Sequence, residues 1–376
     1  MTIACLADLA DAAKAPRLVL KVGSALLVEG GEPRREWLAG LVAEIAGARA
    51  RGQQVIIVSS GAIALGAARL GMKRGGRASL ADAQAAAAVG QIALSGLWAE
   101  LLAAHGLTAA QILLSLHDLE ERRRYLNATA TLTRLLDAGA VPVINENDTV
   151  ATEEIRFGDN DRLAARVAQA AGASAVVLLS DVDGLFDRDP REAGASLVPL
   201  AHGVIDDMRG MAGASSGSGM GSGGMASKMQ AAEIADLAGI AMAIVNGTHP
   251  APLARAIGED IGTVILPTRS AGARKAWLGG KLTVRGTLTI DTGAAEALRH
   301  GNSLLAAGVT DVSGRFVRGD TVAIAGPDGA VIAQGLCEYT AEECAALMGR
   351  HSREHAELLG HAPRPAVVHR DQMVLK

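Results

Sequence analysis

Two lysines that lie far apart in the chain stand next to glycines at the edges of regular elements. Lys21 closes the apolar run 18–22 and precedes Gly23, and Lys228 stands at the start of a helical pattern. In open parallel sheets, ligands gather at the carboxyl ends of strands, and helix N-termini attract anions. The two ammonium groups therefore indicate an anion site, although a strand-end lysine that only reaches water is the commoner explanation of Lys21 taken alone.

Glycine-rich segments support an anion site. Residues 210–224 contain seven glycines and four serines without one charge, and they lead into Lys228. A flexible linker is one interpretation, but a mobile glycine-rich loop that ends in lysine at a helix start suits a triphosphate. The segment 59–62 (Ser-Ser-Gly-Ala) follows the apolar run 55–58 and could either offer N–H groups to an anion or act as an ordinary N-cap.

Carboxylates and carboxamides gather in two further segments. Residues 145–148 (Asn-Glu-Asn-Asp) follow the apolar run 141–144, and residues 158–161 (Gly-Asp-Asn-Asp) open a helical pattern. Such groups can bind an ammonium group or Mg²⁺, or hold charged side chains in place. An Asx turn with an N-cap explains one or two of these residues but not the whole set.

The elements that must position these residues are short apolar runs alternating with helical patterns. This alternation predicts an α/β fold with a mostly parallel sheet sandwiched between helices, up to about residue 266. Between the first two runs, residues 34–51 place five large apolar side chains on one helical stripe. The six predicted strands are 18–22, 55–58, 112–114, 141–144, 176–179 and 244–245.

The sequence pattern changes after residue 267. A polar stretch of small residues is followed by short alternating segments such as 282–284 and 288–290, with turn signals at 291–293, 313–314 and 327–329. This pattern predicts a small β-rich barrel. We therefore expect a first domain over 1–267, a linker over 268–280 and a second domain over 281–376.

Composition excludes several classes of protein. The 376 residues carry 36 basic and 40 acidic side chains, so there is no global positive field for nucleic acid or anionic membrane. The three cysteines form no CxxC pair, which predicts neither disulfides nor structural zinc and fits a reducing cytosol. Residues 1–16 lack the basic start of a signal peptide, and 85–104 fits a buried helix better than a membrane span. The HxxEH stretch 351–355 is expected to be a solvated helix face with no metal.

Taken together, six motifs resemble the amino acid kinase family, and within it the branch that phosphorylates glutamate. The resemblance covers nearly the whole chain, because the region after 280 resembles the PUA domain found in many of these kinases. The sequence departs slightly from the family pattern at Ser59, at Ser180 and at the pair Ala226-Ser227. These differences keep the backbone N–H donors. The motifs are Lys-Val-Gly-Ser (21–24), Ser-Ser-Gly-Ala-Ile (59–63), Ile-Asn-Glu-Asn-Asp (144–148), Gly-Asp-Asn-Asp (158–161), Ser-Asp-Val-Asp-Gly (180–184) and Gly-Gly-Met-Ala-Ser-Lys (223–228).

The resemblance implies transfer of the γ-phosphoryl group of ATP to the side-chain carboxylate of L-glutamate, the first step of proline synthesis, with ATP and Mg²⁺ as cofactors. It implies that the 210–224 loop is open or disordered until nucleotide binds. The implied catalytic residues are Lys21, Lys228 and Asp161, with Asp161 holding the two lysines. Glutamate is expected at Ser60, Asp148 and Asn160, and ATP at Lys21, Gly23, Ser180, Asp181, Ser222, Gly223, Gly224, Met225, Ala226, Ser227 and Lys228.

Alternatives remain at this point. Acetylglutamate, aspartate or UMP could be the substrate on the same fold, or the chain could be an RNA-binding PUA protein. Residues 281–376 hold ten basic and eleven acidic residues without a basic stripe, which argues against RNA binding. The resemblance further suggests feedback inhibition by proline, a homo-oligomer, contact with glutamyl phosphate reductase, and a cytoplasmic location without membrane partners.

Overall fold

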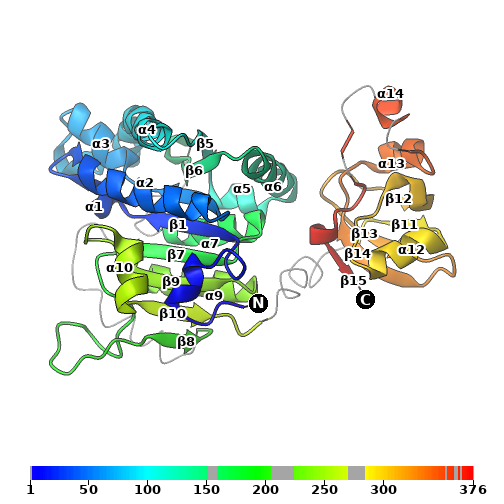
Figure 1. The fold of residues 1–376 in the computed structure, drawn as a ribbon. Coiled ribbons are helices and arrows are strands. Elements are labelled where there is room, and N and C mark those ends of the chain that lie inside the picture. The colour runs from blue at the N-terminus through cyan, green and yellow to red at the C-terminus, as the bar shows by residue number, and fades with distance from the viewer. Residues whose placement is uncertain are drawn as a thin grey trace. The chain divides into compact units, whose positions relative to one another are not determined.

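The chain divides into two compact units, residues 1–269 and 270–376 (Figure 1). The computed structural model describes residues 2–150, 159–204, 224–269, 284–351, 354–359, 363–364 and 366–375. Most of the predicted linker, together with the glycine-rich segment up to Gly223, lies outside these residues. The predicted linker and the predicted opening of the glycine-rich loop therefore stay predictions.

An eight-stranded sheet forms the middle of the first unit, in the order β5-β6-β4-β1-β7-β9-β10-β8. Every neighbouring pair is parallel except β9 with β10. The predicted mostly parallel sheet is thus confirmed, and all six predicted runs fall on its strands. The strands are β1 (Arg17–Val22), β4 (Gln54–Ser59), β5 (Ala109–Leu114), β6 (Val141–Glu146), β7 (Ala175–Ser180), β8 (Leu200–His202), β9 (Ala241–Asn246) and β10 (Thr263–Leu266).

Helices cover both faces of this sheet and separate its interior into two apolar layers (Figure 1). One layer joins the sheet to α2, α4 and α10, and the other joins it to α6, α7 and α9. A small hairpin of β2 (Val28–Glu29) and β3 (Glu32–Pro33) precedes α2. The helices are η1 (Leu6–Ala10), α1 (Ser24–Leu27), α2 (Arg35–Ala50), α3 (Ala62–Arg69), η2 (Lys73–Gly76), α4 (Leu80–Ala103), α5 (Leu116–Glu120), α6 (Arg122–Asp137), η3 (Asp148–Val150), α7 (Asp159–Ala171), α9 (Met225–Leu237) and α10 (Pro252–Glu259).

Helices α3 and α4 touch through their backbones. A methyl group added to Gly66 would lie 1.7 Å from the carbonyl oxygen of Ala86, and one added to Gly90 would lie 1.7 Å from that of Ala62. By length and composition α4 could cross a membrane, but its face from Ala83 to Leu102 is buried in the unit, as in the core helix of a globular protein. The predicted buried helix is thus right for one face, while Ile92 on the other is 75% exposed.

The second unit contains a five-stranded sheet in the order β12-β11-β13-β14-β15, antiparallel except for β11 with β13. Its β-rich character is as predicted, but the turn expected at 291–293 is wrong, because Asp291 instead caps a helix by accepting from the Ala294 N–H. Its elements are β11 (Gly286–Ile290), α12 (Thr292–Arg299), η4 (Ala306–Gly308), β12 (Val309–Gly314), β13 (Thr321–Ala325), β14 (Val331–Leu336), α13 (Ala341–Leu347), α14 (His355–Leu359), η6 (Arg370–Gln372) and β15 (Met373–Leu375).

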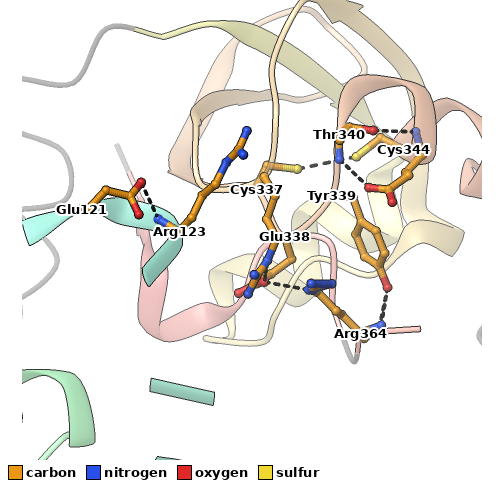
Figure 2. A network of polar contacts seen from close by, with 10 residues as sticks. Glu121, Arg123, Cys337, Glu338, Tyr339, Thr340, Cys344 and Arg364 are labelled. Carbon is orange, nitrogen blue, oxygen red and sulfur yellow. Dashed lines mark hydrogen bonds and ion pairs between the residues drawn. The ribbon is translucent and has the colours of Figure 1, made fainter. Parts of the chain in front are cut away.

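The end of β14 and the start of α13 share a polar network (Figure 2). The Tyr339 hydroxyl donates to the Arg364 carbonyl oxygen at 2.9 Å, and the free thiols of Cys337 and Cys344 lie 3.6 Å apart. The hydrogen bond with Cys337 and burial raise the pKa of the Cys344 thiol, so this thiol stays protonated at neutral pH. This network has the character of a packed structural core.

The HxxEH stretch differs from expectation at His355. Within the described residues, no group of three His, Cys, Asp or Glu side chains is arranged to hold a metal. His355, however, is buried, and its Nε2 lies 3.2 Å from the Arg350 carbonyl oxygen, so it does not belong to a solvated face.

Candidate active site

The alternation of side chains along β1 aims Lys21 at the helices α7 and α9. Leu18, Leu20 and Val22 pack into the apolar layer of α2 and α4, whereas Val19 packs into the layer of α7 and α9. Since side chains two apart on a strand share a face, Lys21 points to the same side as Val19. An ammonium group thus enters the layer where α7 and α9 begin.

The first turns of α7 and α9 complete an ionic cluster around Asp161. The Lys21 Nζ lies 2.6 Å from Asp161 Oδ1, and the Lys228 Nζ lies 3.6 Å from Asp161 Oδ2. The Ser227 hydroxyl donates to Asp161 Oδ2 at 2.8 Å. The three predicted catalytic residues, from three separate parts of the chain, are therefore in direct contact.

The cluster is almost completely removed from water. Asp161 is 0% exposed, Lys228 4% and Lys21 6%. Buried charges are unfavourable unless paired, and here two ammonium groups share one carboxylate. Two ammonium groups held close together in a buried position suit an anionic group such as a phosphoryl.

The pKa values reflect this crowding. Burial raises the pKa of Asp161, but the charges of Lys21 and Lys228 and two hydrogen bonds outweigh it and hold the pKa below its usual value. Burial lowers the pKa of Lys228, the charge of Lys21 lowers it further, and Asp161 and Asp181 only partly oppose them. The carboxylate is therefore firmly ionised, while Lys228 loses its proton more readily than a free lysine.

Two glycines border the cluster at strand ends. Gly23 caps α1, and a methyl group added to it would lie 3.6 Å from the Lys21 Nζ. Gly61 caps α3 with φ at +110°, a conformation that glycine adopts without strain and other residues rarely reach. Both glycines thus follow the carboxyl ends of neighbouring parallel strands, Gly23 after β1 and Gly61 after β4.

A chain of amide hydrogen bonds lies next to the cluster. Asn160, the neighbour of Asp161, donates through Nδ2 to the Ser60 hydroxyl at 2.7 Å and to Asn145 Oδ1 at 3.1 Å. Two of the three predicted glutamate-binding residues, Ser60 and Asn160, are thus in direct contact. The third, Asp148, is 8% exposed and lines a cavity of about 260 Å³.

The predicted nucleotide residues approach the cluster from β7 and α9. Ser180 ends β7, which neighbours β1, and its hydroxyl donates to Asp181 Oδ1 at 3.2 Å. Asp181 is close enough to raise the pKa of Lys228. Gly224 caps α9, so Met225, Ala226 and Ser227 form its first turn ahead of Lys228. Ser222 and Gly223 lie outside the described residues.

Sequence reasoning missed three contributors. Ser227, expected only at the nucleotide, also holds Asp161. Asn145 was part of a motif but had no assigned role. Burial lowers the pKa of Arg77, and the opposite charge of Asp148 is near enough to oppose this shift. No pattern marks Arg77, because it precedes α4 in a segment without apolar periodicity.

Comparison with known proteins identifies the families of both units. The model of the amino acid kinase family matches residues 16–246, and that of the PUA domain matches residues 286–359. A glutamate 5-kinase of Novosphingobium aromaticivorans is 67% identical over 376 residues and covers all of both chains. Those of Sphingopyxis alaskensis and Zymomonas mobilis are 60% and 54% identical, each over 96% of this chain and over 98% and 91% of their own.

The identities extend through both units, and the matched family covers the strands and helices that carry Lys21, Asp161 and Lys228. The chain therefore belongs to the glutamate 5-kinases, a branch of the amino acid kinase family with a C-terminal PUA domain.

Proposed function

We propose that this chain transfers the γ-phosphoryl group of ATP to the side-chain carboxylate of L-glutamate. The observation that carries the proposal is the buried Lys21–Asp161–Lys228 cluster. Beside it, Asn160 directly precedes Asp161 and donates to Asn145. One part of this arrangement fits an anionic phosphoryl group, and the other fits the polar groups of an amino acid. The product would be glutamyl 5-phosphate, at the start of proline synthesis.

The physical task is to bring two anions together. Phosphoryl transfer depends on positioning and on neutralising the charge that spreads over the transferring oxygens. Lys21 and Lys228 would contact these oxygens, and the N–H groups of Gly23 and Gly61 would add fixed dipoles. Asp161 holds the two ammonium groups at a defined separation. It has no role as a base, because a carboxylate acceptor carries no proton to remove.

The acceptor would lie along the amide chain. Ser60 and Asn160 form one wall, and the carboxylate of Asp148 would meet the α-ammonium group of the substrate. This arrangement would leave the γ-carboxylate of the substrate nearest to Lys21.

The nucleotide would lie beside Ser180, Asp181 and the first turn of α9, with its phosphates toward Lys228. Ser222 and Gly223 would belong to the same loop. Mg²⁺ would arrive with ATP, since it prefers oxygen ligands and the phosphates supply them, and it would neutralise phosphate charge.

Further partners belong to the proposal. Proline would act as a feedback inhibitor in the amino acid pocket, and the chain would work in the cytoplasm as a homo-oligomer that passes its acyl phosphate to glutamyl phosphate reductase. We expect no membrane partner and no salt-sensitive RNA binding, because residues 281–376 carry slightly more acidic than basic side chains.

A coupled ADP-release assay tests the substrate. Glutamate, N-acetylglutamate, aspartate and UMP would be compared at equal ATP and Mg²⁺, with kcat/KM as the readout. We expect a clear preference for glutamate. A higher kcat/KM for any of the other three would overturn the proposed substrate while leaving the kinase family intact.

A further inference from the structure

Helix α4 contacts the proposed amino acid site through the polar side chain of Gln91. Gln91 lies on α4, and its Oε1 accepts a hydrogen bond from Asn145 Nδ2 at 2.9 Å. Asn145 is 3% exposed on β6 and in turn accepts from Asn160. Gln91 therefore stands at the outer end of a relay that runs through two amides to the Ser60 hydroxyl.

The relay determines which way each amide faces. Asn145 presents its nitrogen to Gln91, so its oxygen must face Asn160. Asn160 Nδ2 then uses both of its hydrogens, one on Asn145 and one on Ser60. As a result, Asn160 Oδ1 is a buried acceptor without a hydrogen-bond partner among the described residues. A buried oxygen in that state calls for a donor, and the α-ammonium group of an amino acid is one.

The close backbone contact between α3 and α4 fixes the position of Gln91 relative to Ser60. Its neighbour Gly90 sits against the first turn of α3, where an added methyl group would lie 1.7 Å from the Ala62 carbonyl oxygen. That turn begins directly after Ser60 and Gly61. The close contact of α3 and α4 thus ties both ends of the relay to one rigid pair of helices.

We infer that Gln91 is a positioning residue for the amino acid substrate. Gln91 lines the same cavity as Asp148, and its Oε1 is bound to Asn145. It acts by fixing the orientation of Asn145, so that Asn160 keeps its oxygen turned to the substrate. This inference rests on the proposed role of Asn160 in holding the amino acid.

The test compares Gln91→Met, which keeps the length of the side chain but cannot accept the bond, with Gln91→Glu, whose carboxylate oxygen still can. We expect Gln91→Met to raise the KM for glutamate about three- to tenfold, the range of one net hydrogen bond, with kcat within twofold and the KM for ATP unchanged. Gln91→Glu should restore most of the lost affinity. Gln91→Ala gives a second removal of the acceptor in a residue that favours helix, should the methionine variant fail to fold.

Glu100→Gln is the matched control, because Glu100 lies further along α4, is exposed, pairs with Arg35 and does not line the cavity that holds Gln91 and Asp148. It should leave all three constants unchanged. The inference is overturned if the Met and Ala variants keep a normal KM for glutamate, or if kcat and both KM values change together with a fall in the melting temperature. Asn160→Ala distinguishes failure of the proposed substrate site from failure of the inference about Gln91. If Asn160→Ala keeps a normal KM for glutamate, the proposed role of Asn160 is wrong, and the relay has no function. If Asn160→Ala raises this KM while Gln91→Met does not, only the inference about Gln91 is refuted.

Discussion

Replacing Asp161 with asparagine would remove the carboxylate that two buried ammonium groups share, with almost no change in shape. At an effective dielectric constant of about 20, the attractions over 2.6 Å to Lys21 and 3.6 Å to Lys228 are each about 5–6 kcal/mol before desolvation is counted. Removing one partner of a buried ion pair typically lowers the free energy of unfolding by about 3–5 kcal/mol. We expect a loss in this range for Asp161→Asn, together with a large fall in kcat, since the lysines lose their fixed separation.

Urea unfolding followed by tryptophan fluorescence would measure the loss, because Trp37 and Trp98 are both buried in the first unit. Asp189→Asn is the matched control: Asp189 also has an ion pair at 2.6 Å, but its partner Arg191 is 65% exposed, so the same substitution should matter far less. A second variant, Asp161→Asn with Lys228→Met, should recover part of the stability by removing one stranded charge. Unchanged stability and near-normal kcat in Asp161→Asn would refute the cluster as the organising element of the site.

Three further predictions concern neighbouring parts of the first unit. Because burial lowers the pKa of Lys228, its ammonium form should be lost at a pH below the usual lysine pKa of 10.5. We therefore expect kcat/KM to fall on the alkaline side at a lower pH than an ordinary lysine would cause. A pH–rate profile that stays flat up to pH 10.5 would contradict this prediction. Asp148→Ala should raise the KM for glutamate at least tenfold and spare ATP binding measured by calorimetry, and an equal loss of both would mean that this carboxylate is structural. Gly90→Ala should lower the free energy of unfolding by about 1–3 kcal/mol, because the added methyl group would clash with Ala62. Gly96→Ala on the same helix should be neutral or stabilising, because a methyl group there would have no neighbour within 4 Å. Equal effects of the two substitutions would argue against the close α3–α4 contact.

The strands and the ionic cluster were accessible from the sequence for a shared physical reason. Strands buried on both faces leave continuous apolar runs, and all six predicted runs lie on strands of the sheet. Parallel strands bring their carboxyl ends to one edge, so polar residues that directly follow such runs must lie close together. Lys21 and Ser60 met this condition, and Asp161 and Lys228 stand in first turns of helices that return to the same edge.

Other features depend on contacts that no local pattern encodes. β8 and β10 are short strands at the far edge of the sheet, and β10 runs antiparallel to β9. The Asp291 segment has the composition of a turn, but its aspartate caps a helix. Gln91 lies within the apolar stretch 85–104, and the tertiary contact of α4 with β6 gives it a partner in Asn145.

The central claim is that Lys21 and Lys228 converge on one transferring phosphoryl group. A crystal structure with glutamate, Mg²⁺ and a non-hydrolysable ATP analogue tests it most directly. The account predicts the Nζ atoms of both lysines within about 2.7–3.2 Å of γ-phosphate oxygens, with Asp161 still between them. A γ-phosphate bound away from either ammonium group would contradict it.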